Sequence, residues 1–125
     1  ITNQSGIGRG YYKEQDLHRL NKWMLEQFTN HGIEILDIFF CLHNPNTECN
    51  CRKPKPGLLL DANKKYCIDM KNSWMIGDKE VDVGAANSAG ITNTILVKTG
   101  HEIDETKSNA RFILKSIEDC IGIIG

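Results

Sequence analysis

The sequence carries no strong excess of either charge and few aromatic residues. Its 15 lysine and arginine residues are balanced by 16 aspartate and glutamate residues, which gives a formal net charge of -1. Such a balance offers no basic surface for nucleic acid or for an anionic membrane. Aromatic residues make up 7% of the chain and are too scattered to form a stacking platform for bases. We therefore expect no nucleic-acid partner and no membrane partner.

The sequence also lacks a long apolar stretch, a secretory signal, internal repeats and low-complexity tracts. With only 3 prolines, 40% hydrophobic residues and 125 residues in total, it has the composition of one globular domain with one core. The chain starts at Ile1 and not at a methionine, so we expect an upstream segment to precede it. We predict a single domain over residues 1–125 and a cytoplasmic location.

Short β-rich runs alternate with helical patterns along the chain. The end of a strand and a turn are expected at 1–5, and strands at 35–40, 73–76 and 94–97. Helices are expected from Glu14 to a stop at Gly32, after Pro56, at 81–89 and from Ser116. This alternation predicts an α/β fold with a doubly wound parallel sheet. Ligands of such sheets bind beyond the carboxyl ends of the strands. The residues expected to share that edge are Thr2, Cys41, Asp78 and Lys98.

Three cysteines and a histidine are concentrated between residues 41 and 51. Cys41 and His43 form one pair, and Cys49 and Cys51 form a second pair across a short turn. Four such ligands fill a zinc tetrahedron and leave no position for water, so the metal would be structural. Ordinary free thiols with an incidental histidine, or disulfides in an exported protein, remain the alternatives. The other two cysteines, Cys67 and Cys120, are expected to be buried and inert on helical faces.

Two groups of residues favour an anion site. Arg52 and Lys53 directly follow the last cysteine of the metal loop, so a bound metal would hold two neighbouring cations in place. Adjacent cations elsewhere are usually solvated. The turn at residues 2–5 contributes hydroxyl and amide donors that suit the oxygens of a phosphoryl group. Together the two groups indicate a phosphate.

An acidic turn follows the strand predicted at 73–76. Asp78 lies at the strand end, where its carboxylate suits a hard cation such as Mg²⁺. Asp82 is placed to support Asp78 or the loop, or to cap the next helix. Lys79 is either a contact for a substrate anion or an exposed lysine.

Three motifs occur together and in order: TNQSGIGRGY at 2–11, the Cys-x-His and Cys-x-Cys-Arg-Lys-Pro-Lys-Pro-Gly run at 41–57, and MIGDKEVD at 75–82. In this combination the chain resembles phosphatases of the haloacid dehalogenase superfamily over nearly its whole length. The resemblance implies a Rossmann-like core and removal of the 7-phosphate of D-glycero-D-manno-heptose 1,7-bisphosphate, a step toward the lipopolysaccharide core. It implies Mg²⁺ and structural Zn²⁺ as cofactors, a phosphorylated sugar as substrate, and a monomeric intact enzyme.

The resemblance also implies a role for each motif residue. Thr2 would hydrogen-bond the transferring phosphoryl group, and Asn3, Gln4 and Ser5 would complete the substrate-binding turn. Lys53 would neutralise developing charge, and Arg52 would recognise the substrate. Asp78 would bind Mg²⁺ and Lys79 would contact the substrate. The zinc ligands would be Cys41, His43, Cys49 and Cys51.

One family motif is absent from the sequence. These phosphatases use an aspartate nucleophile and a second aspartate as general acid and base, both in an Asp-x-Asp motif after the first strand. The chain has no such motif and begins inside the second one. The expectation is a C-terminal fragment that lacks the first strand, has no turnover of its own and binds Mg²⁺ weakly.

Two alternative functions are kept. The compact spacer between His43 and Cys49 is also found in histidinol-phosphate phosphatases, which the chain resembles in its zinc loop. A zinc-stapled module that captures phosphorylated ligands without chemistry is the second alternative. The presence or absence of an Asp-x-Asp upstream of Ile1 separates enzyme from binding module.

Overall fold

The computed structural model describes all residues, Ile1–Gly125, and divides them into two compact units. The first unit is Ile1–Arg52 and the second is Lys53–Gly125. The division therefore falls between the two adjacent cations of the predicted anion site. Each unit is described by itself below.

The first unit is built on a short parallel strand pair. Strand β1 (Thr2–Asn3) pairs with strand β2 (Phe40–Cys41), with Thr2 opposite Phe40 and Asn3 opposite Cys41. The backbone N–H of Gln4 continues the pairing and donates to the carbonyl oxygen of Cys41 over 2.7 Å. This register places the predicted phosphate-binding turn beside the first cysteine of the metal loop.

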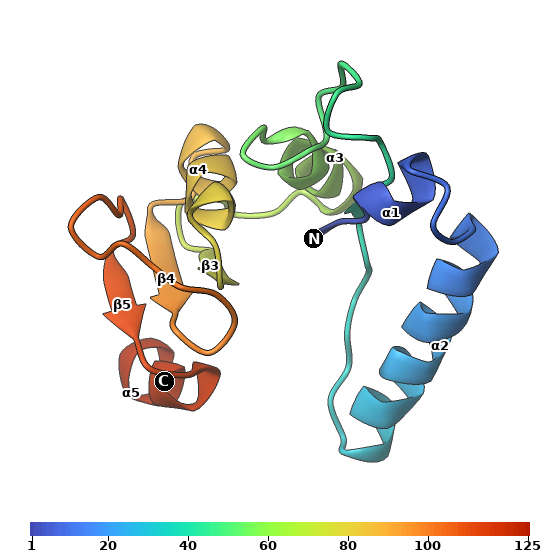
Figure 1. Ribbon diagram of the computed structural model, residues 1–125. Helices are drawn as coiled ribbons and strands as arrows, with labels where there is room; N and C mark the ends of the chain where they lie inside the picture. Colours follow the sequence, from blue (N-terminus) through green and yellow to red (C-terminus); the bar gives the residue numbers. More distant parts are fainter. The chain divides into compact units, whose positions relative to one another are not determined.

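Helices α1 (Ser5–Gly8) and α2 (Glu14–Asn30) follow β1. In the first turn of α2 the carboxylate of Asp16 accepts the backbone N–H of Lys13 at 2.9 Å and so satisfies a donor at the helix start. The helix ends before Gly32, whose positive φ of 72° turns the chain back. The next segment runs in an extended form beside the helix (Figure 1). The predicted helix and its stop are confirmed.

The strand expected at 35–40 is shorter in the structure, where only Phe40 and Cys41 form a ladder. The residues before Phe40 form no ladder, because β1 offers only two residues for pairing. A strand is defined by the neighbour to which it is hydrogen-bonded as well as by its own sequence. The length of β2 is therefore set by β1.

The second unit contains a parallel sheet of three strands. Strands β3 (Trp74–Gly77), β4 (Asn93–Val97) and β5 (Phe112–Leu114) lie in that order, all parallel. Figure 1 shows β4 between β3 and β5, with helix α4 (Glu80–Ser88) forming the crossover from β3 to β4. The α/β class with parallel strands is confirmed, and the apolar run at 112–114 is a further strand of it.

Apolar residues on the middle strand form the centre of this unit. Ile95 and Val97 pack with Cys120, and partly buried residues of the neighbouring strands close over them. The chain ends in a 3₁₀ turn (Ile117–Cys120) and helix α5 (Ile121–Ile124), near the predicted start at Ser116. Among the helices of both units, none combines the length and the apolar composition that crossing a bilayer requires.

Helix α3 (Gly57–Tyr66) opens the second unit and buries Leu58, Leu59 and Ala62, as its pattern predicts. The expectation for Cys67 is wrong: it is exposed and lies just past the end of α3, in a left-handed conformation with φ of 51°. Helix α3 ends at Tyr66, one residue before Cys67, so Cys67 is not on a helical face. Cys120 is buried, as predicted.

Gly77 closes β3 against the carboxylate that organises the next turn. A methyl group at Gly77 would overlap the side chain of Asp82. We expect Gly77→Ala to destabilise the protein by about 1–3 kcal/mol, the usual cost of overpacking. The urea unfolding midpoint measures this. Gly122→Ala is the matched control, because a methyl group there meets nothing within 4 Å; equal midpoints for the two variants would contradict the expectation.

Candidate functional site

The four predicted metal ligands come together in the first unit. One ligand atom from each of Cys41, His43, Cys49 and Cys51 lies within 4.8 Å of all the others. Cys41 is buried at the end of β2, and the other three are half-buried on the loop that follows. The pairing of β1 with β2 fixes the first ligand, and the loop returns the second pair to it.

The sulfurs of Cys41 and Cys49 are spaced as two ligands of a tetrahedral zinc would be. The Sγ atoms of Cys41 and Cys49 are 3.8 Å apart, and Nδ1 of His43 is 3.3 Å from Sγ of Cys41 and 3.1 Å from Sγ of Cys51. Zn–S bonds of about 2.3 Å at the tetrahedral angle place two sulfurs roughly 3.8 Å apart. The four donors could hold a metal such as zinc.

Cys41 and Cys51 are joined by a disulfide bond, with their Cα atoms 5.5 Å apart. Metal binding requires both as thiolates, so the two states exclude each other. A disulfide alone gives no reason for an imidazole nitrogen close to both sulfurs and a third thiol beside them. With both cysteines reduced, the four-atom cluster could hold a metal ion.

The turn at residues 2–5 is also in the first unit, and its side chains are joined by hydrogen bonds. Nε2 of Gln4 donates to Oγ1 of Thr2 over 3.2 Å. The hydroxyl of Tyr12 donates to Oε1 of Gln4 over 2.5 Å. Both ends of the Gln4 amide are thus used within the unit, which makes Gln4 a support for Thr2.

Lys53 and the acidic turn come together in the second unit through one carboxylate. Oδ1 of Asp82 accepts from the ammonium of Lys53, and the two side chains are 5% and 12% exposed respectively. Oδ2 of Asp82 accepts the backbone N–H groups of Asp78 and Lys79, over 3.2 Å and 3.1 Å. Asp82 therefore caps α4 and holds the Asp78 turn, as the two interpretations of this residue expected, and it also holds Lys53.

The carboxylate of Asp78 lies at the end of β3 and is 40% exposed. Oδ2 lies 2.5 Å from Nδ1 of His101. The backbone of Gly100 is so close that a methyl group there would overlap the same carboxylate. An accessible carboxylate at a strand end is a suitable ligand for Mg²⁺.

The loop that carries His101 is held against the start of α4. Glu80 accepts the hydroxyl of Ser108 at 2.7 Å and the backbone N–H of Asn109 at 2.8 Å. Lys98, just past β4, forms an ion pair with Glu105 of the loop. Because β3 and β4 are parallel neighbours, Asp78 and Lys98 share one edge of the sheet, as predicted.

Arg52 is the last residue of the first unit. Its Nη1 atom is buried and has no hydrogen-bond partner. A buried guanidinium nitrogen without a partner is costly and suits an anionic ligand. Lys79, in contrast, is exposed.

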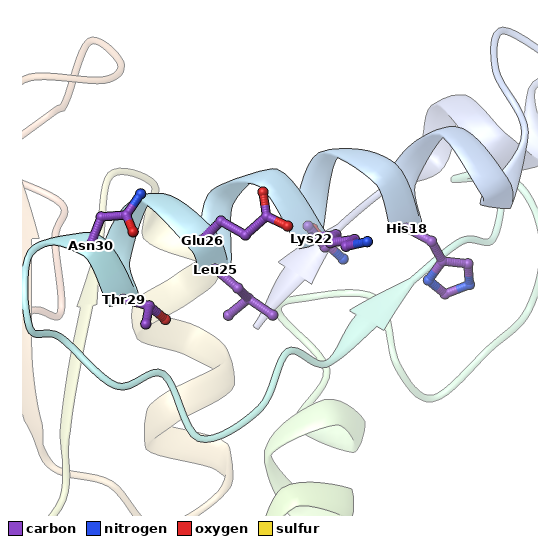
Figure 2. A pocket seen from close by; sticks show the side chains of 7 residues that line it. His18, Lys22, Leu25, Glu26, Thr29 and Asn30 are labelled. Atoms are coloured by element: carbon purple, nitrogen blue, oxygen red, sulfur yellow. The ribbon is translucent and has the colours of Figure 1, made fainter.

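A shallow hollow runs along one face of α2, lined by the side chains that Figure 2 shows in a row on that helix. None of the residues predicted for the site lines it. The residues labelled there are His18, Lys22, Leu25, Glu26, Thr29 and Asn30.

Sequence reasoning missed Tyr12 and His101. Each lies outside the three motifs and is brought to a motif residue by the fold: Tyr12 by the turn between α1 and α2, and His101 by the loop after β4. The Gly100-His101 pair in the loop after a predicted strand was the available signal, since such loops border the ligand edge.

Comparison with known proteins defines the class to which this fold and site belong. A family model described as HAD-hydrolase-like matches residues 50–120. The chain belongs to this family. The matched range includes Lys53, the Asp78 turn and all three strands of the second unit.

Particular relatives are phosphatases of one sugar bisphosphate. The chain is 46% identical to D-glycero-alpha-D-manno-heptose-1,7-bisphosphate 7-phosphatase of Photorhabdus laumondii, over 88% of this chain and 64% of the relative. It is 44% identical to the beta-anomer phosphatase of Pasteurella multocida, over 95% of this chain and 68% of the relative. The Escherichia coli beta-anomer phosphatase is 38% identical, over 95% and 66%. The chain thus spans about two thirds of these relatives.

Two solved structures share the fold. The D,D-heptose 1,7-bisphosphate phosphatase of B. bronchiseptica, complexed with magnesium and phosphate, has a TM-score of 0.77 and 31% identity, covering 88% of this chain and 64% of that one. A putative HAD-like phosphatase of Mesorhizobium loti has a TM-score of 0.83 and 26% identity, covering 99% and 62%. The resemblance seen in the sequence motifs is confirmed.

Proposed function

We propose that this chain forms the phosphate-binding and metal-binding part of a Mg²⁺-dependent phosphatase that removes the 7-phosphate of D-glycero-D-manno-heptose 1,7-bisphosphate. The observation that carries the proposal is the Asp82 carboxylate, which joins Lys53 to the Asp78–Lys79 turn. Asp82 thereby holds both the cation of Lys53 and the turn that carries Asp78, the proposed Mg²⁺ ligand. Relatives named for this reaction at 38–46% identity favour the same substrate.

Each side chain has a proposed part in phosphoryl transfer. The ammonium of Lys53, which is held by its ion pair with Asp82, neutralises charge that develops on the phosphoryl oxygens. Asp78 would hold Mg²⁺, which when bound withdraws charge from those oxygens. Arg52 recognises the substrate through its unpaired nitrogen, and Lys79 contacts the substrate.

The turn after β1 and the cysteine cluster have supporting parts. Thr2 hydrogen-bonds the phosphoryl group, with Asn3, Gln4 and Ser5 completing the turn. The four cluster residues would hold structural zinc, and because Cys51 precedes Arg52, the zinc would also fix the start of the cation pair.

The chain has no Asp-x-Asp, so the proposal assigns the nucleophile to sequence in the third of the relatives that it does not span. A carboxylate oxygen there attacks phosphorus, the bond to the sugar oxygen breaks, and a second carboxyl group protonates that oxygen. Water then hydrolyses the aspartyl-phosphate. We place this enzyme in the cytoplasm, as a monomer with no nucleic-acid or membrane partner.

The test compares residues 1–125 with the complete gene product. We expect the complete protein to release phosphate from the heptose bisphosphate in the presence of Mg²⁺, and residues 1–125 alone to release none above background. Colorimetric phosphate release measures both. Turnover by residues 1–125 would refute the assignment of the nucleophile.

The same assay separates the alternatives. A higher kcat/KM for histidinol phosphate than for the heptose bisphosphate would move the protein to the histidinol-phosphate phosphatases. Phosphate binding without turnover of either ester by the complete protein would support the binding module.

A further inference from the structure

Three side chains in the first unit form a continuous hydrogen-bonded series that ends at Thr2. We propose that Tyr12 is a positioning residue that acts through Gln4 to direct the Thr2 hydroxyl proton at a phosphoryl oxygen. The inference rests on the proposed function in one respect, the contact of Thr2 with the phosphoryl group. It adds a residue outside the three sequence motifs that determines how this contact is made.

The direction of the series follows from the chemistry of the amide. Tyr12 donates its hydroxyl proton to Oε1 of Gln4 over 2.5 Å. With Oε1 occupied by that donor, the amide presents Nε2 to Oγ1 of Thr2, 3.2 Å away. An amide nitrogen only donates, so Thr2 must be the acceptor in this second hydrogen bond. In this arrangement the Tyr12 hydroxyl occupies Oε1 and holds the Gln4 amide with Nε2 facing Thr2.

The hydroxyl proton of Thr2 is then directed away from Gln4. Within the unit the carbonyl oxygen of Asn3 is 3.5 Å from Oγ1, beyond the roughly 2.5–3.0 Å of a normal O–H···O hydrogen bond. A phosphoryl group has only acceptor oxygens and can take this proton at full strength. The Thr2 hydroxyl can therefore exchange its long hydrogen bond to Asn3 for a shorter one to a phosphate oxygen.

The position of the Tyr12 ring is fixed by the turn that it supports. A methyl group on Gly6 would overlap the ring, so the ring lies where a side chain of residue 6 would be. The backbone N–H of Tyr11 donates to the carbonyl oxygen of Gly6 over 2.8 Å, which holds the segment in place. Tyr12 is half-buried, whereas its neighbour Tyr11 is 75% exposed.

The first experiment removes the hydroxyl group of Tyr12 from the complete protein. Tyr12→Phe keeps the ring and deletes the hydroxyl that donates to Gln4. The Gln4 amide can then rotate, and its Oε1 can accept the hydroxyl proton of Thr2. We expect kcat/KM for the heptose bisphosphate to fall by about tenfold, the size of one hydrogen bond, with an unchanged melting temperature. Tyr11→Phe is the matched control and should keep the wild-type value. Equal kcat/KM for the two variants would overturn the proposal.

A double-mutant cycle tests whether Tyr12 acts through Thr2. Thr2→Val removes the hydroxyl, so adding Tyr12→Phe to it should cause no further loss. If the two losses multiply, Tyr12 acts by another route and the relay is wrong. Gln4→Glu supplies a second check, because a carboxylate accepts the Thr2 proton. It should lose as much activity as Thr2→Val, and wild-type activity in Gln4→Glu would contradict the direction of the relay.

Affinity for inorganic phosphate separates this proposal from the proposed function. Calorimetric titration of the complete protein with phosphate and Mg²⁺ requires no knowledge of the substrate. If the heptose bisphosphate is not hydrolysed, the proposed function fails, and a weaker phosphate affinity of Tyr12→Phe than of Tyr11→Phe still supports the relay. Identical affinities of these two variants would overturn the relay whatever the substrate.

Discussion

Lys53→Met in the complete protein is expected to lower kcat by about 10²–10³-fold, the usual effect of removing one preorganised donor to developing charge. The ammonium of Lys53 is largely buried and held by Asp82, so it is already oriented before a substrate binds. Methionine preserves the volume of the chain and removes only the charge. Steady-state phosphate release at saturating Mg²⁺ measures the loss.

Lys64→Met is the control for this variant, because Lys64 is exposed in the last turn of α3. It makes the same chemical change away from Asp82 and should keep wild-type activity. Asp82→Asn keeps an acceptor for the N–H groups of Asp78 and Lys79 but removes the ion pair, so its loss should be smaller than that of Lys53→Met. Wild-type activity in Lys53→Met would exclude Lys53 from the reaction.

Cys49→Ser should abolish stoichiometric zinc binding and strongly destabilise the protein. Structural zinc in small domains binds with roughly 10–16 kcal/mol of apparent free energy. Losing about 3 kcal/mol of this would lower the Tm by roughly 10 °C in a chain of this size. Elemental analysis of protein purified under reducing conditions gives the zinc content, and calorimetry gives the Tm.

Cys67→Ser is the matched control, since Cys67 is exposed and lies outside the cluster. It should retain one zinc per chain and the wild-type Tm. Wild-type protein without zinc, together with equal Tm values for the two variants, would leave the disulfide of Cys41 and Cys51 as the natural state of the loop.

The sequence predicted those parts of the fold that depend on local pattern. The helix from Glu14, the helix after Pro56 and the turn at Gly77-Asp78 were all expected from periodicity and from glycine positions. The ligand cluster was expected from spacing, because four donors within eleven residues can meet whatever the rest of the chain does.

The missed features depend on contacts between distant positions. The length of β2 depends on how many residues β1 offers 38 positions earlier. The contact of His101 with Asp78 spans 23 positions and is made by the return of a loop. Cys67 was misplaced for a local reason, since nothing in the helical period of α3 indicates the left-handed residue that ends it.

The backbone hydrogen bond between Gln4 and Cys41 links the proposed phosphate-binding turn to the cysteine cluster, 37 positions further along the chain. A metal held by Cys41 would stiffen β2, and through β1 it would steady the turn that aims the Thr2 hydroxyl. Removing the metal with a chelator should then lower the activity, although the metal site itself does not contact the sugar phosphate. Adding the metal back would restore the order of the turn. The cysteine cluster would then stabilise the proposed phosphate-binding turn reversibly.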